Sequence, residues 1–198
     1  MDCHGVAADQ KKVRTLKATL IFLDETGFSL MPHVAKTWGL VGKTPVLKCR
    51  GRHRQRISAI VAVTVSPKAR RLGLLFRTHL NSAIDQHRVL GFIKDLMTHR
   101  RGPIVLVMDN INTHKSKLLK AYLNQHPRLH VHYLPPYAPE LNPTEWHFED
   151  AKCHELANHG LLEINELRKR VQGHIRKTSA NPKKIRGYLQ SAKLPWRI

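Results

Sequence analysis

Apolar runs and helical patterns alternate along the chain in an order typical of α/β proteins. Two continuous apolar runs, 19–24 (TLIFLD) and 104–109 (IVLVMD), each end in an aspartate and predict strands buried on both faces. A β-branched stretch at 57–65, a turn at Ser66-Pro67 and a second apolar stretch at 72–78 predict a hairpin. Residues 129–134 predict a further strand, so the pattern indicates five strands in all.

Helical patterns lie between and after these strands. Apolar residues of 82–99 fall on one helical face, and further helices are predicted at 115–126, from Pro143 onward, at 163–178 and at 182–192. The order strand, hairpin, helix, strand, helix, strand, helix predicts an α/β fold with a central mixed sheet and helices packed on its faces. We expect a flexible basic lead-in at 1–18 and one domain with C-terminal helices at 19–198, since 198 residues fit a single domain.

Charge points to a polyanionic partner. Lys and Arg total 34 against 14 acidic residues, which gives a net charge of +20. Basic side chains that neutralise phosphates release counterions, so a nucleic acid is the expected partner. A ribosomal-type RNA binder and a merely soluble basic surface are the alternatives. The densest basic run is either a solvated loop or a track for the DNA backbone, and the overall charge favours the track, which comprises Arg50, Arg52, Arg54 and Arg56.

Composition excludes several other classes of protein. With 41% apolar residues, disorder of the whole chain is not expected. No apolar run approaches the roughly 20 residues of a membrane-spanning helix, so no membrane partner is expected. Three cysteines, odd in number and far apart, predict neither a disulfide framework nor a zinc knuckle. A reducing cytoplasm is the expected location.

The two aspartates that follow apolar strands are the first candidates for chemistry. Burying an ionised carboxylate is costly, and Asp24 and Asp109 would lie close together if their strands are parallel neighbours. A divalent cation resolves both the burial and the repulsion, and Mg²⁺ or Mn²⁺ prefers such oxygen ligands. The alternative is that each aspartate only caps or turns the end of its strand.

A third acid, Glu145, lies in the sequence Leu-Asn-Pro-Thr-Glu-Trp. Asn142 is the expected helix cap, Pro143 the first helical residue and Glu145 the third, which also makes a capping box. Periodicity alone does not choose Glu145 over Glu149, one turn later, as a metal ligand.

Three blocks together resemble the signature of mariner-like DDE transposases, in particular their bacterial insertion-sequence branch. The blocks are FLDETGF at 22–28, MDN at 108–110 with HKS at 114–116, and YAPELNPTE at 137–145, and 35 residues separate Asp109 from Glu145. Residues 37–46, which include Lys43, also resemble the family, and the resemblance covers about 19–190.

The resemblance implies an RNase H-like fold and a two-metal site for Mg²⁺, with Mn²⁺ as a substitute. Asp24 would bridge the two ions, and Asp109 and Glu145 would each complete one site. The implied activity is cleavage of transposon-end DNA and joining of 3′-hydroxyl ends to target DNA, carried out by a homodimer. The resemblance also implies double-stranded DNA as the partner and the bacterial cytoplasm, at the nucleoid, as the location. Members of the family carry N-terminal helix-turn-helix modules, for which residues 1–18 are too short, so we expect an excised catalytic domain or a truncated or split reading frame.

Further residues are candidates for supporting roles. Asn110, His114 and Lys115 could orient Asp109 or contact phosphate, or could simply begin the next helix. Trp38 and Tyr137 could stack on bases, although isolated aromatics more often serve packing. Glu25 would point to the sheet face opposite Asp24, so we do not count it as a ligand.

Two other functions are open alternatives on sequence alone. One is another RNase H-like nuclease, such as a junction resolvase, against which the Asn-Pro-Thr-Glu block argues. The other is a catalytically inactive or domesticated DNA-binding remnant, against which the presence of all three acids argues.

Overall fold

The fold is organised by one mixed sheet of five strands. The computed structural model describes residues 13–31, 33–47, 55–68 and 71–194. The strands are β1 (Thr19–Ser29), β2 (Arg56–Val65), β3 (Leu72–Leu80), β4 (Ile104–Met108) and β5 (Leu129–Tyr133), in the spatial order β3-β2-β1-β4-β5. β2 is antiparallel to β1 and to β3, whereas β4 is parallel to β1 and to β5. The predicted α/β fold with a mixed five-stranded sheet is confirmed.

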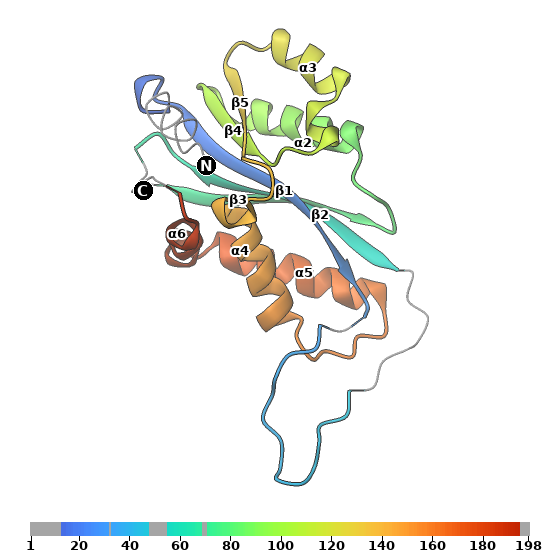
Figure 1. Ribbon diagram of the computed structural model, residues 1–198. Coiled ribbons are helices and arrows are strands. Elements are labelled where there is room, and N and C mark those ends of the chain that lie inside the picture. The colour runs from blue at the N-terminus through green and yellow to red at the C-terminus, as the bar shows by residue number, and fades with distance from the viewer. Residues whose placement is uncertain (1–12, 32, 48–54, 69–70, 195–198) are drawn as a thin grey trace.

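Helices cover both faces of this sheet (Figure 1). On one face lie α2 (Gln86–His99) and α3 (Lys117–Asn124), and on the other lie α4 (Pro143–Asp150), α5 (Ile164–Ser179) and α6 (Pro182–Ser191). Short 3₁₀ turns precede α3 (η1, Asn112–Lys115) and α4 (η2, Pro139–Leu141). α4 continues without a break into a π-helical turn, η3 (Ala151–Glu155).

The continuous apolar runs in β1 and β4 follow from this layering. Successive side chains of a strand point to opposite faces, so a strand between two helical layers must be apolar at every position. Leu20 and Phe22 belong to the core beneath α4, α5 and α6. Ile21 and Leu23, which alternate with them, belong to the core beneath α2 and α3.

Among the predicted bounds, the structure moves the end of β1 and the starts of two helices; the helix predicted over 82–99 begins at Gln86. β1 does not end at Asp24 but continues to Ser29, because β2 pairs with it as far as Ser29 and Arg56. The helix predicted from residue 115 begins at Lys117, where the Ser116 hydroxyl accepts a hydrogen bond from the Leu119 amide and caps it.

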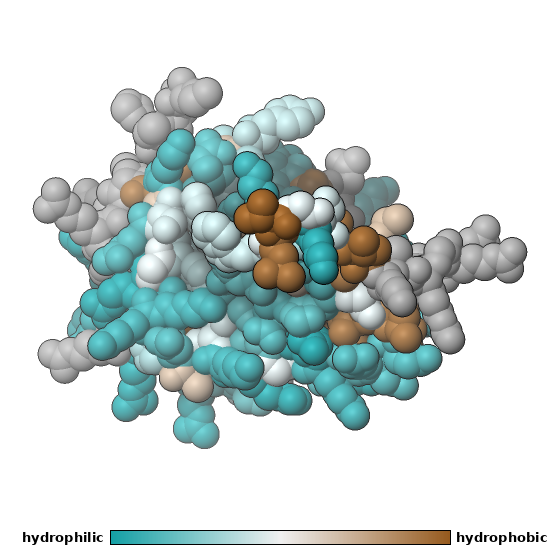
Figure 2. All heavy atoms as spheres, turned by 90° about the horizontal axis from the view of Figure 1, so that it is seen from below, coloured by the Kyte–Doolittle hydropathy of each residue, from teal (hydrophilic) through white to brown (hydrophobic). Residues whose placement is uncertain are grey.

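Two peripheral segments frame the domain. Of the predicted lead-in, the described part carries Val13 and Leu16, which pack against the core beneath α4, α5 and α6. Residues 33–47 project beyond the end of the sheet, and the Asn158 side chain anchors their base through two hydrogen bonds of 3.0 Å to the backbone of Ala35. Figure 2 views this end of the molecule and shows apolar side chains in a largely hydrophilic surface. None of the helices in the described part of the chain is long and apolar enough to cross a membrane.

Candidate active site

Strand register brings the two aspartates to the same level of the sheet. The last pair between the parallel strands β1 and β4 is Phe22 with Val107. Asp24 and Asp109 each lie two residues beyond this pair. Asp109 directly follows β4, whereas Asp24 lies within β1, at the point where β4 has ended and only β2 still pairs with it. The end of β4 therefore opens the sheet beside Asp24.

Helix α4 is fixed to β1 by two side-chain hydrogen bonds near its first turn. The Asn142 amide group donates to Oδ2 of Asp24 at 2.9 Å, while its carbonyl oxygen caps the helix by accepting from the Thr144 amide at 3.1 Å. The Thr144 hydroxyl donates to the carbonyl oxygen of Phe22 at 3.2 Å. Because Glu145 follows in the same turn, these contacts place it beside Asp24.

The three acids line one pocket of about 380 Å³. The other residues around it are uncharged and come mostly from the proline-rich loop before α4: Asn110, Ile111, Leu134, Pro135, Pro136, Tyr137, Ala138, Pro139 and Asn142. No lysine or arginine is among the described residues that line this pocket. The pocket thus gathers three carboxylates, and none of its described lining residues is basic.

The surroundings of Asp24 disfavour its ionised form. Its side chain is buried, with 6% exposed. Burial, and next the charge of Glu145, raise the pKa of Asp24 to about 8, although the hydrogen bond of 2.8 Å from the Glu25 amide to Oδ1 lowers it. An ionised Asp24 therefore requires compensating positive charge, which a divalent cation would supply.

His114 is buried and contacts both Asp109 and Glu25, and Glu25 lies on the face of β1 opposite Asp24. His114 Nδ1 lies 2.6 Å from Oδ1 of Asp109, and its Nε2 lies 3.0 Å from Oε1 of Glu25. Burial alone would lower the pKa of His114, but the hydrogen bonds and charges of Asp109 and Glu25 together outweigh it and raise this pKa to about 10. The imidazolium is therefore held between two carboxylates. Tyr133 steadies the turn by donating a hydrogen bond of 2.8 Å to the His114 carbonyl oxygen.

Some predicted contact residues lie at this pocket and others do not. Asn110, Tyr137 and Asn142 line it, and Tyr137 is fully exposed with a left-handed backbone (φ +58°). Lys115 lies with its ammonium group 5.6 Å from the ring centre of Tyr133, outside the lining. Trp38 and Lys43 lie on the exposed projecting segment, and Arg56 is exposed at the start of β2. The predicted track residues Arg50, Arg52 and Arg54 fall outside the described residues.

Sequence reasoning missed two features around the site. Glu25 was placed on the opposite face from Asp24, as observed, but its contact with His114 spans 89 positions of sequence and gives no local signal. The histidines of α4 and α5 were not grouped either, although His147 and Asp150 have the one-turn spacing that places them on one helical face.

Comparisons with known proteins assign the chain to a family. Residues 19–168 match the family described as "DDE superfamily endonuclease". An insertion element IS630 uncharacterized 39 kDa protein of Shigella sonnei is 25% identical over 165 residues, which make up 82% of this chain and 46% of that protein. The chain thus spans about half the length of this curated relative.

Solved structures with the same fold belong to the Mos1 mariner transposase. Its paired-end complex with the left transposon end is 16% identical, with a TM-score of 0.59, over 96% of this chain and 60% of that chain. Its isolated catalytic domain is 13% identical, with a TM-score of 0.55, over 98% of this chain and 92% of that one. These likenesses confirm the RNase H-like fold implied by the sequence resemblance. Because the family match covers most of the chain, this protein belongs to the DDE superfamily endonucleases, as the mariner-like signature blocks indicate.

Proposed function

We propose that this chain is the catalytic part of a DNA transposase, which cleaves transposon-end DNA and joins the 3′-hydroxyl ends to target DNA. One observation carries the proposal: three acids from β1, the end of β4 and the first turn of α4 line one pocket whose described lining has no basic side chain. The solved relatives, described as mariner transposase complexes with a transposon end and with Mn or Mg, support this proposal.

Asp24, Asp109 and Glu145 fit a site for two Mg²⁺ ions, with Mn²⁺ as a substitute. The raised pKa of Asp24 and the lack of basic lining residues in the described pocket favour hard divalent cations as the missing positive charge. Such ions would lower the pKa of the attacking water or 3′-hydroxyl and stabilise the leaving oxygen. We assign Asp24, between the other two acids, as the shared ligand.

The surrounding residues position these ligands. Asn142 and the Glu25 amide hold one oxygen each of Asp24, which fixes the plane of its carboxylate. His114 holds Oδ1 of Asp109 and leaves the other oxygen for the pocket. Tyr137, which is exposed and lines the pocket, is the proposed stacking partner of a base, and Asn110, which also lines the pocket, is a proposed contact to the DNA backbone.

The partners that we propose are double-stranded DNA and a second copy of the chain in the active complex. The net charge of +20 supports DNA binding outside the acidic pocket. Lys43, Lys115 and Arg56, with the arginines at 50, 52 and 54, are the proposed contacts to the DNA backbone. The bacterial nucleoid, where this substrate lies, is the proposed place of action.

Plasmid nicking by the purified chain with Mg²⁺ tests the proposal without requiring recognition of a particular end sequence. Asp109→Asn and Glu145→Gln should each nearly abolish nicking and leave DNA binding intact. Glu149→Gln is the matched control, because Glu149 is exposed one turn later on the same helix. Normal nicking by Glu145→Gln would refute the ligand assignment.

Two further results would favour the alternative functions. DNA binding without nicking in Mg²⁺ or Mn²⁺ would favour a non-catalytic remnant. Preferential cleavage of four-way junctions or RNA–DNA hybrids, without joining of 3′-hydroxyl ends to a target, would favour another RNase H-like nuclease.

A further inference from the structure

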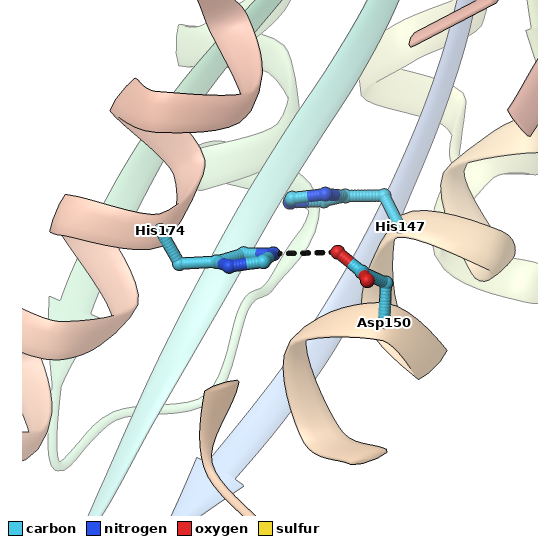
Figure 3. Close-up of side chains that lie close together, drawn as sticks. All are labelled: His147, Asp150 and His174. Atoms are coloured by element: carbon cyan, nitrogen blue, oxygen red, sulfur yellow. Dashed lines mark ion pairs between the residues drawn. The ribbon is translucent and has the colours of Figure 1, made fainter. Parts of the chain in front are cut away.

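A second group of metal-ligating side chains lies away from the acidic pocket. His147 and Asp150 on α4 face His174 on α5, and one ligand atom from each lies within 4.8 Å of the others (Figure 3). None of these three residues lines the candidate active-site pocket. Two imidazole nitrogens and one carboxylate oxygen form a ligand set different in kind from the three acids.

His174 is oriented as a metal-binding histidine commonly is. Its Nε2 lies 3.0 Å from Oδ2 of Asp150, and its Nδ1 lies 3.6 Å from Oε2 of Glu155. A carboxylate on one imidazole nitrogen fixes the ring so that the other nitrogen faces the metal. Glu155 is the last residue of the π-helical turn η3, and such turns are frequent at functional sites.

His147 is a buried polar side chain without a partner. It has no exposed surface, and neither ring nitrogen makes a hydrogen bond to any described residue. Leaving a buried polar atom unsatisfied costs about 1–3 kcal/mol, so such an atom calls for an explanation. The ring stacks on His174, with centroids 5.3 Å apart, which explains its packing but leaves its nitrogens unpaired. Burial lowers the pKa of both histidines, which favours the neutral imidazole that ligates metals.

We propose that His147, Asp150 and His174 bind one Zn²⁺ ion, or a similar transition-metal ion that prefers imidazole nitrogen, at a site separate from the acidic pocket. Zn²⁺ is bound by such sets at about 2.0–2.2 Å, so its ligand atoms lie about 3.4 Å apart in a tetrahedral site. The present ligand atoms lie within 4.8 Å of one another, and the stacked rings of His147 and His174 would have to rotate for both nitrogens to face one ion. Mg²⁺, which prefers oxygen ligands, does not suit this set.

A lysine now supplies the positive charge at this position. Lys184 Nζ lies 2.7 Å from Oδ2 of Asp150, and the Tyr188 hydroxyl donates to the same oxygen at 2.7 Å. Lys184 is therefore a competitor that Zn²⁺ must displace. A bound ion would join α4 to α5 at His147 and Asp150, in the helix turn that follows Glu145.

Zn²⁺ titration of the tag-free full chain, stripped with a chelator, tests the site. Mg²⁺ is kept in excess so that Zn²⁺ bound at hard-cation sites is outcompeted. We expect one tightly held Zn²⁺ per chain by elemental analysis and a rise in Tm on adding Zn²⁺. Glu155→Gln should weaken binding by about 10–100-fold, as loss of an orienting carboxylate does. His174→Gln should weaken it further.

Two variants make the test specific. His154→Gln is the matched control, because His154 is exposed on the same π-helical turn and should not alter Zn²⁺ affinity. Lys184→Met removes the competing cation and should increase the affinity severalfold, a gain that damage to the fold would not produce.

Three results would overturn the proposal. They are failure of the wild-type chain to retain Zn²⁺, equal Zn²⁺ affinity of His174→Gln and His154→Gln, and loss of Zn²⁺ binding in Asp109→Asn. The last would place the ion at the acidic pocket. Since the readouts are metal content and Tm, the proposed transposase activity can fail without affecting this test.

Discussion

Replacing Asn142 by aspartate isolates one contact that holds the candidate site together. The side chain has two separate roles: its oxygen caps α4 at the Thr144 amide, and its amide group donates to Oδ2 of Asp24 at 2.9 Å. Aspartate is as good a helix cap as asparagine, so the first role survives the change. The second is lost, and a carboxylate then faces Asp24 at hydrogen-bonding distance.

The expected loss of stability follows from burial of both partners. Asn142 and Asp24 are 2% and 6% exposed, so an unsatisfied oxygen of Asp24 has little access to water. Loss of such a partner costs about 1–3 kcal/mol. In a chain of this size, about 2 kcal/mol corresponds to a fall in Tm of about 4–8 °C. Burial and neighbouring charge already raise the pKa of Asp24, so a further carboxylate adds to the repulsion.

Thermal unfolding of the wild type, Asn142→Asp and Asn142→Ser at about pH 9, above the pKa of about 8 of Asp24, measures this effect in chelator and in Mg²⁺. Serine keeps a capping oxygen but adds no charge, so it should lose stability in chelator without gaining extra benefit from Mg²⁺. The aspartate variant should recover more of its lost Tm in Mg²⁺ than the wild type gains, because a cation relieves the added repulsion. An unchanged Tm of Asn142→Asp in chelator, or equal gains in Mg²⁺, would refute the reasoning.

Two further changes probe the contacts around the site. Thr144→Val removes the hydroxyl that donates to the buried Phe22 carbonyl oxygen and should lower the free energy of unfolding in urea by about 1–3 kcal/mol. Thr144→Ser keeps a hydroxyl and should lower it less. Equal losses in the two variants would argue against the hydrogen bond. The folded pKa of His114, about 10, lies above the ordinary value of 6.5, so its stabilisation is complete below pH 6.5 and is lost as the pH rises toward 10. In metal-free buffer the stability difference between wild type and His114→Gln should shrink over that range, and a constant difference would contradict the imidazolium between Asp109 and Glu25.

The strands show which bounds can be predicted from local sequence pattern. β4 lies between helical layers, and β5 packs its apolar side chains against the core beneath α2 and α3. Their predicted bounds, 104–109 and 129–134, each lie within one residue of the observed ends. The end of β1 was misplaced because its continuation, Glu25 to Ser29, contains polar residues and a glycine. Pairing with β2 extends the strand there, and no pattern within β1 encodes the partner.

At the candidate site, too, the sequence predicted the local features but not the contacts between distant segments. Asp109 follows its strand as the sequence predicted, and Asn142 caps α4 as predicted. That the amide of Asn142 also holds Asp24, 118 positions earlier in the chain, has no signature in either segment. The roles of Asp24, Asp109 and Glu145 as metal ligands stay predictions, supported by their common pocket.

The sequence by itself determined the alternation of strands and helices, the basic charge and the three signature blocks, because periodicity, composition and spacing are properties of contiguous residues. The tertiary structure alone decided which side chains meet: Glu25 with His114, Asn142 with Asp24, and His147 with His174. Such meetings depend on strand order and helix packing, which arise from the burial of many side chains at once. A polar contact between distant segments is therefore a product of the whole core, and neither segment carries it alone.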